Sequence, residues 1–205
     1  MTALGHTRSH FRVRFLARWL GNSEASSLAE FAISLPLLVV LVVGVFDFGG
    51  AFNQKQELNN AVREGARFGA SQPTNDLCNG CQAPPSVDAI RVLVDSYLLA
   101  AHLNDCGLST TPLPSSGANL TWAYGPTSLG SGCAGPLTLT IIRGYPDCGL
   151  PTPPQAPPTV NIPCTKVTIS YPYAWHFNSV IQLLVPGSNY ALSNISTSAT
   201  VANTD

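Results

Sequence analysis

The chain of 205 residues is long enough for one modest domain and a membrane anchor. Only 10% of its residues are charged and the formal net charge is −1, so we expect no basic surface for nucleic acid. No glycine-rich phosphate loop, pair of catalytic carboxylates or nucleophile with a neighbouring base stands out in the sequence. We therefore expect a protein that is not an enzyme and that has no cofactor and no metal site.

The first 25 residues form a basic leader. It holds four of the chain's ten basic residues, Arg8, Arg12, Arg14 and Arg18, and no acid precedes Glu24. Because positive residues collect on the cytoplasmic side of a membrane segment, this asymmetry places the amino terminus in the cytoplasm. Loss of the leader after residue 25 would leave six basic and ten acidic residues, a formal charge of −4.

An apolar run over residues 28–46 is long enough to span a membrane. As a helix it would extend about 28 Å, close to the roughly 30 Å hydrocarbon core. Glu30 opens this run, and since an acid in a bilayer costs about 2.5 to 3.5 kcal/mol at the centre, we expect it to serve assembly. Pro36 predicts a gentle kink. A removable signal peptide with cleavage near Ala51 is the alternative, although the run exceeds the usual apolar region of such peptides.

Beyond Asp47 the pattern predicts a water-exposed continuation of the same helix. No proline lies between residues 52 and 70, so the span 27–70 predicts one rod of about 66 Å. Two neighbouring rows at helical spacing, one apolar and one of small residues, are Leu58, Val62 and Ala66, and Ala61, Gly65 and Gly69. The small row predicts a close contact, either with the protein's own sheet or with another subunit.

A charged group lies on the same predicted helix. Arg63 and Arg67 share a face, with Glu64 adjacent. A solvated surface is the simplest interpretation, and a contact with a partner's carboxylates or with the membrane surface is the alternative.

The remainder of the chain changes character. Sixteen of its 17 prolines follow residue 70, which favours short elements and long loops. We expect a second helix over 87–103 and an irregular loop over 149–163. Strands are expected over 120–124, 137–143, 166–173 and 190–201. These strands predict an antiparallel sheet packed on the upper part of the long helix.

The six cysteines all follow the membrane segment and are expected to form disulfides outside the cytoplasm: Cys78, Cys81, Cys106, Cys133, Cys148 and Cys164. Six cysteines allow fifteen pairings, and we favour a bridge from Cys148 to Cys164. A redox role for the Cys78-x-x-Cys81 pair, or a zinc site that adds His102 and Cys106, is the weaker alternative.

Three segments carry a resemblance to the TadE-like family of pseudopilins. They are Ala29-Glu30-Phe31-Ala32-Ile33-Ser34-Leu35-Pro36, Phe46-Asp47-Phe48-Gly49 and Ala61-Val62-Arg63-Glu64-Gly65-Ala66-Arg67. The resemblance covers about residues 26–70. It implies a minor pilin-like subunit of the tight-adherence (Flp-type) pilus, inserted in the cytoplasmic membrane and processed by a prepilin peptidase.

On this resemblance, cleavage falls between Ala25 and Ser26 and places Glu30 at position +5. Its carboxylate would then pair with a neighbouring free α-amine. Such sites usually carry glycine before the cut, where this chain has Ala25. Gly21 is an alternative site, but a cut there leaves Glu30 farther from the new amino terminus.

We therefore expect an α+β, pilin-like protein with a long N-terminal transmembrane and amphipathic helix and a small disulfide-bonded antiparallel β-sheet head. Its parts are a leader (1–25), the helix (26–70) and an extracytoplasmic cysteine- and proline-rich head (71–205). Helix packing and assembly are assigned to Glu30, Phe31, Pro36, Ala61, Arg63, Glu64, Gly65, Arg67 and Gly69. The expected partners are the membrane, other pilins and pseudopilins, the pilus assembly machinery and a prepilin peptidase. Two alternatives are an uncleaved single-pass anchor with an adhesive or ligand-binding head, and a secreted disulfide-rich domain.

Overall fold

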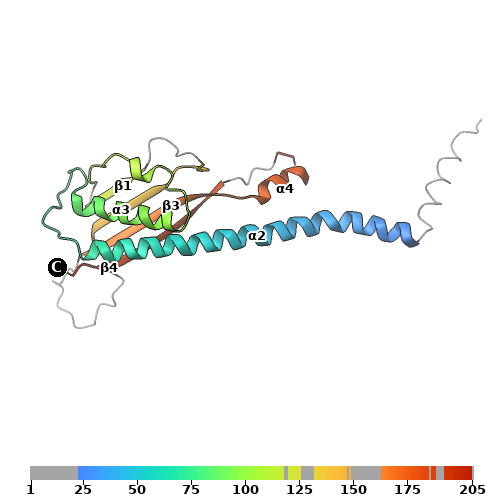
Figure 1. Ribbon diagram of the computed structural model, residues 1–205, viewed down its shortest axis with the longest axis horizontal. Coiled ribbons are helices and arrows are strands. Elements are labelled where there is room, and N and C mark those ends of the chain that lie inside the picture. The colour runs from blue at the N-terminus through green and yellow to red at the C-terminus, as the bar shows by residue number, and fades with distance from the viewer. Residues whose placement is uncertain are drawn as a thin grey trace, which may run out of the picture.

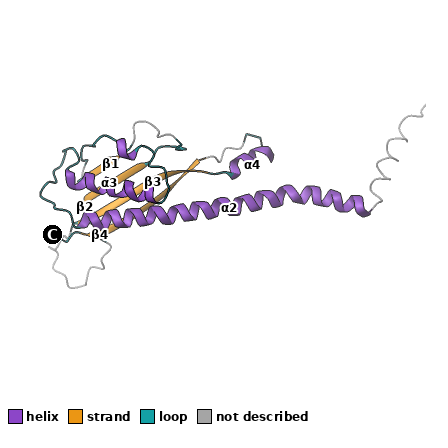
Figure 2. Cartoon of the chain, viewed as in Figure 1, coloured by secondary structure: helices purple, strands orange, loops and turns teal. Residues whose placement is uncertain are grey.

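The computed structural model describes residues 23–117, 120–125, 132–146, 148, 163–184, 186–187 and 192–204. A long helix, α2 (Ser23–Ala70), leads into a head that contains α3 (Pro85–Ala100), the 3-10 turn η1 (Leu108–Thr110) and a sheet. The strands are β1 (Thr121–Tyr124), β2 (Thr138–Tyr145), β3 (Cys164–Ala174) and β4 (Leu192–Ala202). A short helix, α4 (Phe177–Leu184), lies between β3 and β4. Figure 1 shows the head gathered around one end of α2, and Figure 2 distinguishes its helices from its strands.

The long helix is continuous. α2 has 48 residues and passes through Pro36 without a break, so it extends about 72 Å at about 1.5 Å per residue. Its C-terminal part packs on the sheet and on α3, whereas its N-terminal part runs beyond the head (Figure 1). The rod predicted over 27–70 is confirmed, with a start four residues earlier at Ser23.

The sheet is a four-stranded antiparallel meander in the order β1-β2-β3-β4. In its centre Leu139 pairs with Ile169, and Ile141 pairs with Val167. All four side chains are fully buried, because alternate residues of a strand point to the same face and this face is covered by helices. The predicted α+β class with a small antiparallel sheet is confirmed.

The small-residue row of α2 allows α3 to approach closely. A Cβ atom placed on Gly65 would lie 2.8 Å from Val94 Cγ2, and one placed on Gly69 would lie 2.7 Å from both Ile90 Cδ1 and Thr165 Cγ2. Ala61 is also buried. This row therefore packs within the chain, on α3 and β3, so the intramolecular interpretation describes it.

The C-terminal end of α2 is closed by the far end of the chain. The Thr204 N–H donates to the Ala70 carbonyl at 3.2 Å, and Arg143 Nη2 donates to the Gln72 carbonyl at 2.8 Å. The last carbonyls of a helix have no partner within it and carry partial negative charge, so the Thr204 amide stabilises the Ala70 carbonyl. Arg143 holds the turn that follows the helix. These contacts fix the helix end to β2 and to the residues after β4.

Three disulfides join the six cysteines: Cys78–Cys81, Cys106–Cys133 and Cys148–Cys164. The favoured bridge between Cys148 and Cys164 is present and ties the start of β3 to the residues after β2. The thiols of the alternative zinc site are thus used in bridges. The predicted irregular loop over 149–163 lies outside the described residues except for Pro163.

The predicted strands are present, and their ends differ from the prediction by at most two residues. The second helix begins at Pro85 and ends at Ala100 instead of at residue 103. Its end is set by His102, whose φ of 57° is left-handed. The Leu103 N–H donates to the Leu98 carbonyl, and the His102 N–H donates to the Leu99 carbonyl, which is the hydrogen-bond pattern of a Schellman cap without glycine.

Candidate functional site

The N-terminal part of α2 exposes a long apolar surface. From Leu28 to Phe52 most large apolar side chains face outward; Phe31, for example, is 62% exposed. Within the described residues, the part of α2 from Ser27 is the one helix long and apolar enough to cross a membrane, and its most apolar stretch is not buried inside the molecule. An apolar surface of this size is not stable in water, so it requires lipid or other helices as its surroundings.

Asp47 stands where this apolar surface meets the head, and it is only 5% exposed. Its Oδ2 accepts the backbone N–H of Phe177 at 2.6 Å, and its Oδ1 lies 2.9 Å from His176 Nδ1. Its backbone carbonyl accepts the Tyr173 hydroxyl at 3.0 Å. Phe177 is the first residue of α4, so Asp47 caps that helix from another element.

An aromatic cluster surrounds this junction. The ring of Trp175 lies 5.1 Å from Phe48, 4.9 Å from Tyr173 and 5.3 Å from Phe177, measured between centroids. Trp175 Nε1 donates to Ser193 Oγ at 2.7 Å. The cluster therefore joins α2, β3, α4 and the start of β4 in one contact network, which we call the junction cluster (Phe48, Tyr173, Trp175 and Phe177).

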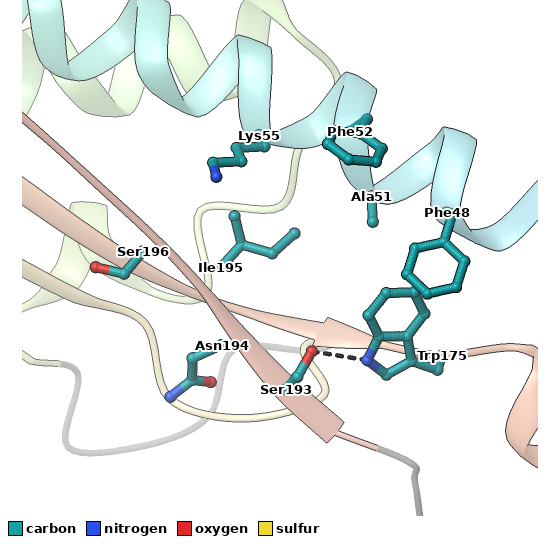
Figure 3. A pocket seen from close by; sticks show the side chains of 9 residues that line it. All are labelled: Phe48, Ala51, Phe52, Lys55, Trp175, Ser193, Asn194, Ile195 and Ser196. Carbon is teal, nitrogen blue, oxygen red and sulfur yellow. Dashed lines mark hydrogen bonds between the residues drawn. The ribbon is translucent and has the colours of Figure 1, made fainter.

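A groove of about 380 Å³ opens beside the junction cluster. Phe48, Ala51, Phe52 and Lys55 of α2 line one side, and Trp175 with residues 193–196 of β4 lines the other. Figure 3 shows the α2 side chains facing β4 across this groove, with the bond from Trp175 to Ser193 at one end. The α2 wall is therefore apolar except for the cation of Lys55. The other wall combines the apolar Trp175 and Ile195 with three polar residues of β4.

Beside the junction cluster, the close approach of α2 and β3 depends on Gly50. A Cβ atom on Gly50 would lie 3.2 Å from the Tyr173 hydroxyl oxygen, whereas one on Gly49 would have nothing within 4 Å. The pair Gly49-Gly50, which could be taken for a cleavage signal, thus lies within α2 and accommodates Tyr173.

The predicted site residues fall into two groups along α2. Ala25 and Ser26 lie near its start, and Glu30, Phe31 and Pro36 follow on the part that extends beyond the head, with Glu30 exposed. The second group lies in the head, with Ala61, Gly65 and Gly69 against α3, and with Arg63 and Arg67 on the exposed side beside Glu64. Arg67 Nη1 lies 4.0 Å from Glu64 Oε2, an exposed pair of small energetic weight.

Sequence reasoning missed the junction between these groups. In the sequence Asp47 marked the end of the apolar run and belonged to one segment of the resemblance, but no partner was predicted for it, and neither Trp175 nor His176 stood out. The available signal was that Asp47 is the one acid between residues 31 and 56 and that it is flanked by phenylalanines, a setting in which an acid needs a partner.

Comparison with known proteins identifies one family. The model of the family described as TadE-like protein matches residues 25–67, which confirms the resemblance of this part of the chain. No curated protein and no solved structure matches the chain. The TadE-like family implies a role in the tight-adherence pilus system and association with the membrane.

Proposed function

We propose that the protein is a minor pilin-like (pseudopilin) subunit of a tight-adherence type pilus or secretion system, with a structural and not a catalytic role. The observation that supports this most strongly is the form of α2. Its N-terminal part presents apolar side chains and Glu30 outward, while its C-terminal part is packed in the head. A helix built in this way can lie in the membrane and later pack against the helices of other subunits.

The orientation that we propose places the leader in the cytoplasm and the head outside it. The arginines of the leader favour the cytoplasmic side. The three disulfides favour an oxidising compartment for the head. Both arguments agree on one direction for α2.

Glu30 has an assembly role in this proposal. An acid on an otherwise apolar helix surface is unfavourable in lipid or between helices unless a cation neutralises it. Cleavage by a prepilin peptidase between Ala25 and Ser26 would free an α-amine one turn of helix away, and the corresponding amine of a neighbouring subunit would be an equally suitable partner.

Replacement of Glu30 tests this role. In the native host, Glu30→Ala should leave the protein in the membrane fraction but reduce pilus number at least tenfold, counted by electron microscopy. Glu57→Ala, which changes an acid of the same helix within the head, is the control and should leave pili unchanged. Wild-type pilus numbers in Glu30→Ala cells would contradict the role.

An uncleaved single-pass anchor that displays an adhesive or ligand-binding head is the second candidate. α2 begins at Ser23 and so runs across the bond between Ala25 and Ser26, and a helical bond is a poor protease substrate. A secreted domain cut near Ala51 is a weaker fit, because the cut would fall in the middle of α2 and would remove Asp47, which caps α4.

A further inference from the structure

α4 has an unusual position and composition. It packs on α2, and Figure 1 shows it projecting beyond the sheet alongside the part of α2 that leaves the head. Five of its eight residues are apolar and none is charged: the helix reads Phe177, Asn178, Ser179, Val180, Ile181, Gln182, Leu183 and Leu184. A helix of this kind next to a membrane span is suited to an apolar environment.

The polar groups at the base of α4 are arranged for an environment that is poor in water. Asp47 is the nearest acid on α2, and both of its carboxylate oxygens have partners inside the protein, at Phe177 and His176. The carboxylate therefore satisfies the first N–H of α4, which would otherwise need a water molecule. Burial of Asp47 also keeps this carboxylate away from a lipid surface at this level.

The junction cluster has the composition of a membrane interface. Trp and Tyr concentrate where hydrocarbon meets the headgroups, and the cluster contains Tyr173 and Trp175. Phe48 of the cluster remains 55% exposed, and Phe52 one turn further along α2 remains 63% exposed. Lys55 follows two turns after Phe48, at the groove, where its ammonium can reach lipid phosphates while its stem lies on apolar surface. The apolar run of α2 ends at Phe46, one residue before Asp47.

We propose that α4 and the junction cluster form a second membrane contact, which lies in the outer headgroup and acyl boundary of the bilayer beside the transmembrane part of α2. The ligand is the phospholipid surface itself. The contact would set the height and tilt of the head above the membrane. This inference rests on the proposed insertion of α2, because the depth of α4 in the bilayer is fixed by the position of the membrane-spanning part of α2.

The test uses Trp175 as a depth probe in the full chain. The Trp19→Phe variant, which retains Trp122 in the buried core and Trp175, is reconstituted into vesicles of phosphatidylcholine and phosphatidylglycerol (3:1), with and without bromine on the acyl chains. Flotation first establishes insertion. We expect bromolipid to reduce the Trp175 emission, taken as the difference from a Trp19→Phe/Trp175→Phe variant, at least twofold.

Two further variants, both in the Trp19→Phe background, separate lipid contact from general effects. Ile181→Asp on α4 should reduce the bromolipid quenching to less than half, because a charge opposes burial in lipid. Val92→Asp changes an exposed apolar residue of α3 and should leave the quenching unchanged.

The outcomes distinguish the two proposals. A chain that inserts but shows no quenching of Trp175 overturns the interfacial contact and leaves the membrane anchor intact. Quenching that falls as the protein concentration rises in the membrane assigns α4 to a contact between subunits and also overturns it. A chain that does not insert overturns the anchor and the interfacial contact together.

Discussion

Asp47 contacts two residues that lie far from it in the sequence. His176 is 129 positions away and Phe177 is 130 positions away. A carboxylate that accepts a helix N-terminal amide is stabilised by both the hydrogen bond and the partial positive charge of that helix end. The two contacts differ in weight, because the His176 side chain is 83% exposed whereas the Phe177 amide is part of α4.

Asp47→Ala should therefore loosen α4. We expect the free energy of unfolding to fall by about 1 to 3 kcal/mol, since a cap and a charge-assisted hydrogen bond are lost together. Hydrogen exchange of the α4 amides in the detergent-solubilised full chain should become faster. His176→Ala is the control and should change stability by less than about 0.5 kcal/mol. Unchanged α4 exchange in Asp47→Ala would show that this cap does not hold the helix.

Asp95 on α3 is a partly buried acid whose carboxyl lacks the hydrogen bonds that Asp47 has. Its Oδ1 is buried and has no hydrogen-bond partner among the described residues. Burial raises the pKa of the Asp95 carboxyl, the nearby charge of Asp105 raises it further, and Arg91 opposes the shift. The folded state thus binds this proton more tightly than the unfolded chain, so the ionised carboxylate is destabilising at neutral pH and protonation relieves that effect.

Asp95→Asn should consequently be more stable than the wild type at pH 7. The difference should shrink as pH falls through the raised pKa of Asp95, because the wild-type carboxyl then becomes neutral as well. Asp105→Asn should act in the opposite direction: the Ser109 hydroxyl and backbone amides lower the pKa of Asp105, so its charge stabilises the fold. Denaturant unfolding at pH 7, 6, 5 and 4 measures the stability of both variants against the wild type. If Asp95→Asn were more stable than the wild type by the same amount at all four pH values, the raised pKa of Asp95 would be contradicted.

At the scale of elements, the contact between α2 and α3 is set by the absence of side chains. In an open helix, Gly→Ala gains about 1 kcal/mol in propensity. Gly69 is not open, because Ile90 and Thr165 occupy the position that a Cβ atom would need. Overpacking of a buried contact costs about 1 to 3 kcal/mol.

Gly69→Ala should therefore lower the free energy of unfolding by about 1 kcal/mol or more, despite its better helix propensity. Gly49→Ala on the same helix has nothing within 4 Å of the added atom and should be neutral or stabilising. Thermal unfolding of the solubilised full chain compares the two. Equal stability of the variants would mean that α3 can move aside without cost.

Sequence patterns predicted the elements that are specified by the pattern of apolar residues within the element itself. The apolar run and the four-residue spacing along α2 predicted its course, and alternation in β3 predicted that strand. The end of α3 was missed because His102 takes a left-handed conformation that usually signals itself by glycine. The local backbone hydrogen bonds of the Schellman cap end the helix there.

The helix α4 was missed for a related reason. Its eight residues are too short for periodicity to separate a helix from a buried strand, and its start depends on a carboxylate supplied by α2. The same holds for the candidate site. Glu30 was visible because an acid in an apolar run is anomalous by itself, whereas the junction cluster exists only after β3 has folded back onto α2.

At the scale of the whole molecule, one helix belongs to two environments. Its upper part is held by α3, by the sheet and by the chain's last described residues, whereas its lower part exposes an apolar surface that the head does not cover. This division suits the proposed pseudopilin, whose helix lies in the membrane before assembly and packs against other helices after it. It also separates two tasks along α2, because Glu30 is exposed and does not belong to the buried core of the head.

The central claim, a pseudopilin processed at its leader, is tested most directly by the mass of the mature chain. Protein recovered from the native membrane fraction would be analysed intact and after digestion, so that its first residue is identified. We predict a chain that begins at Ser26 and retains all of the transmembrane part of α2. An intact leader, or a chain that begins near residue 52, would contradict the account.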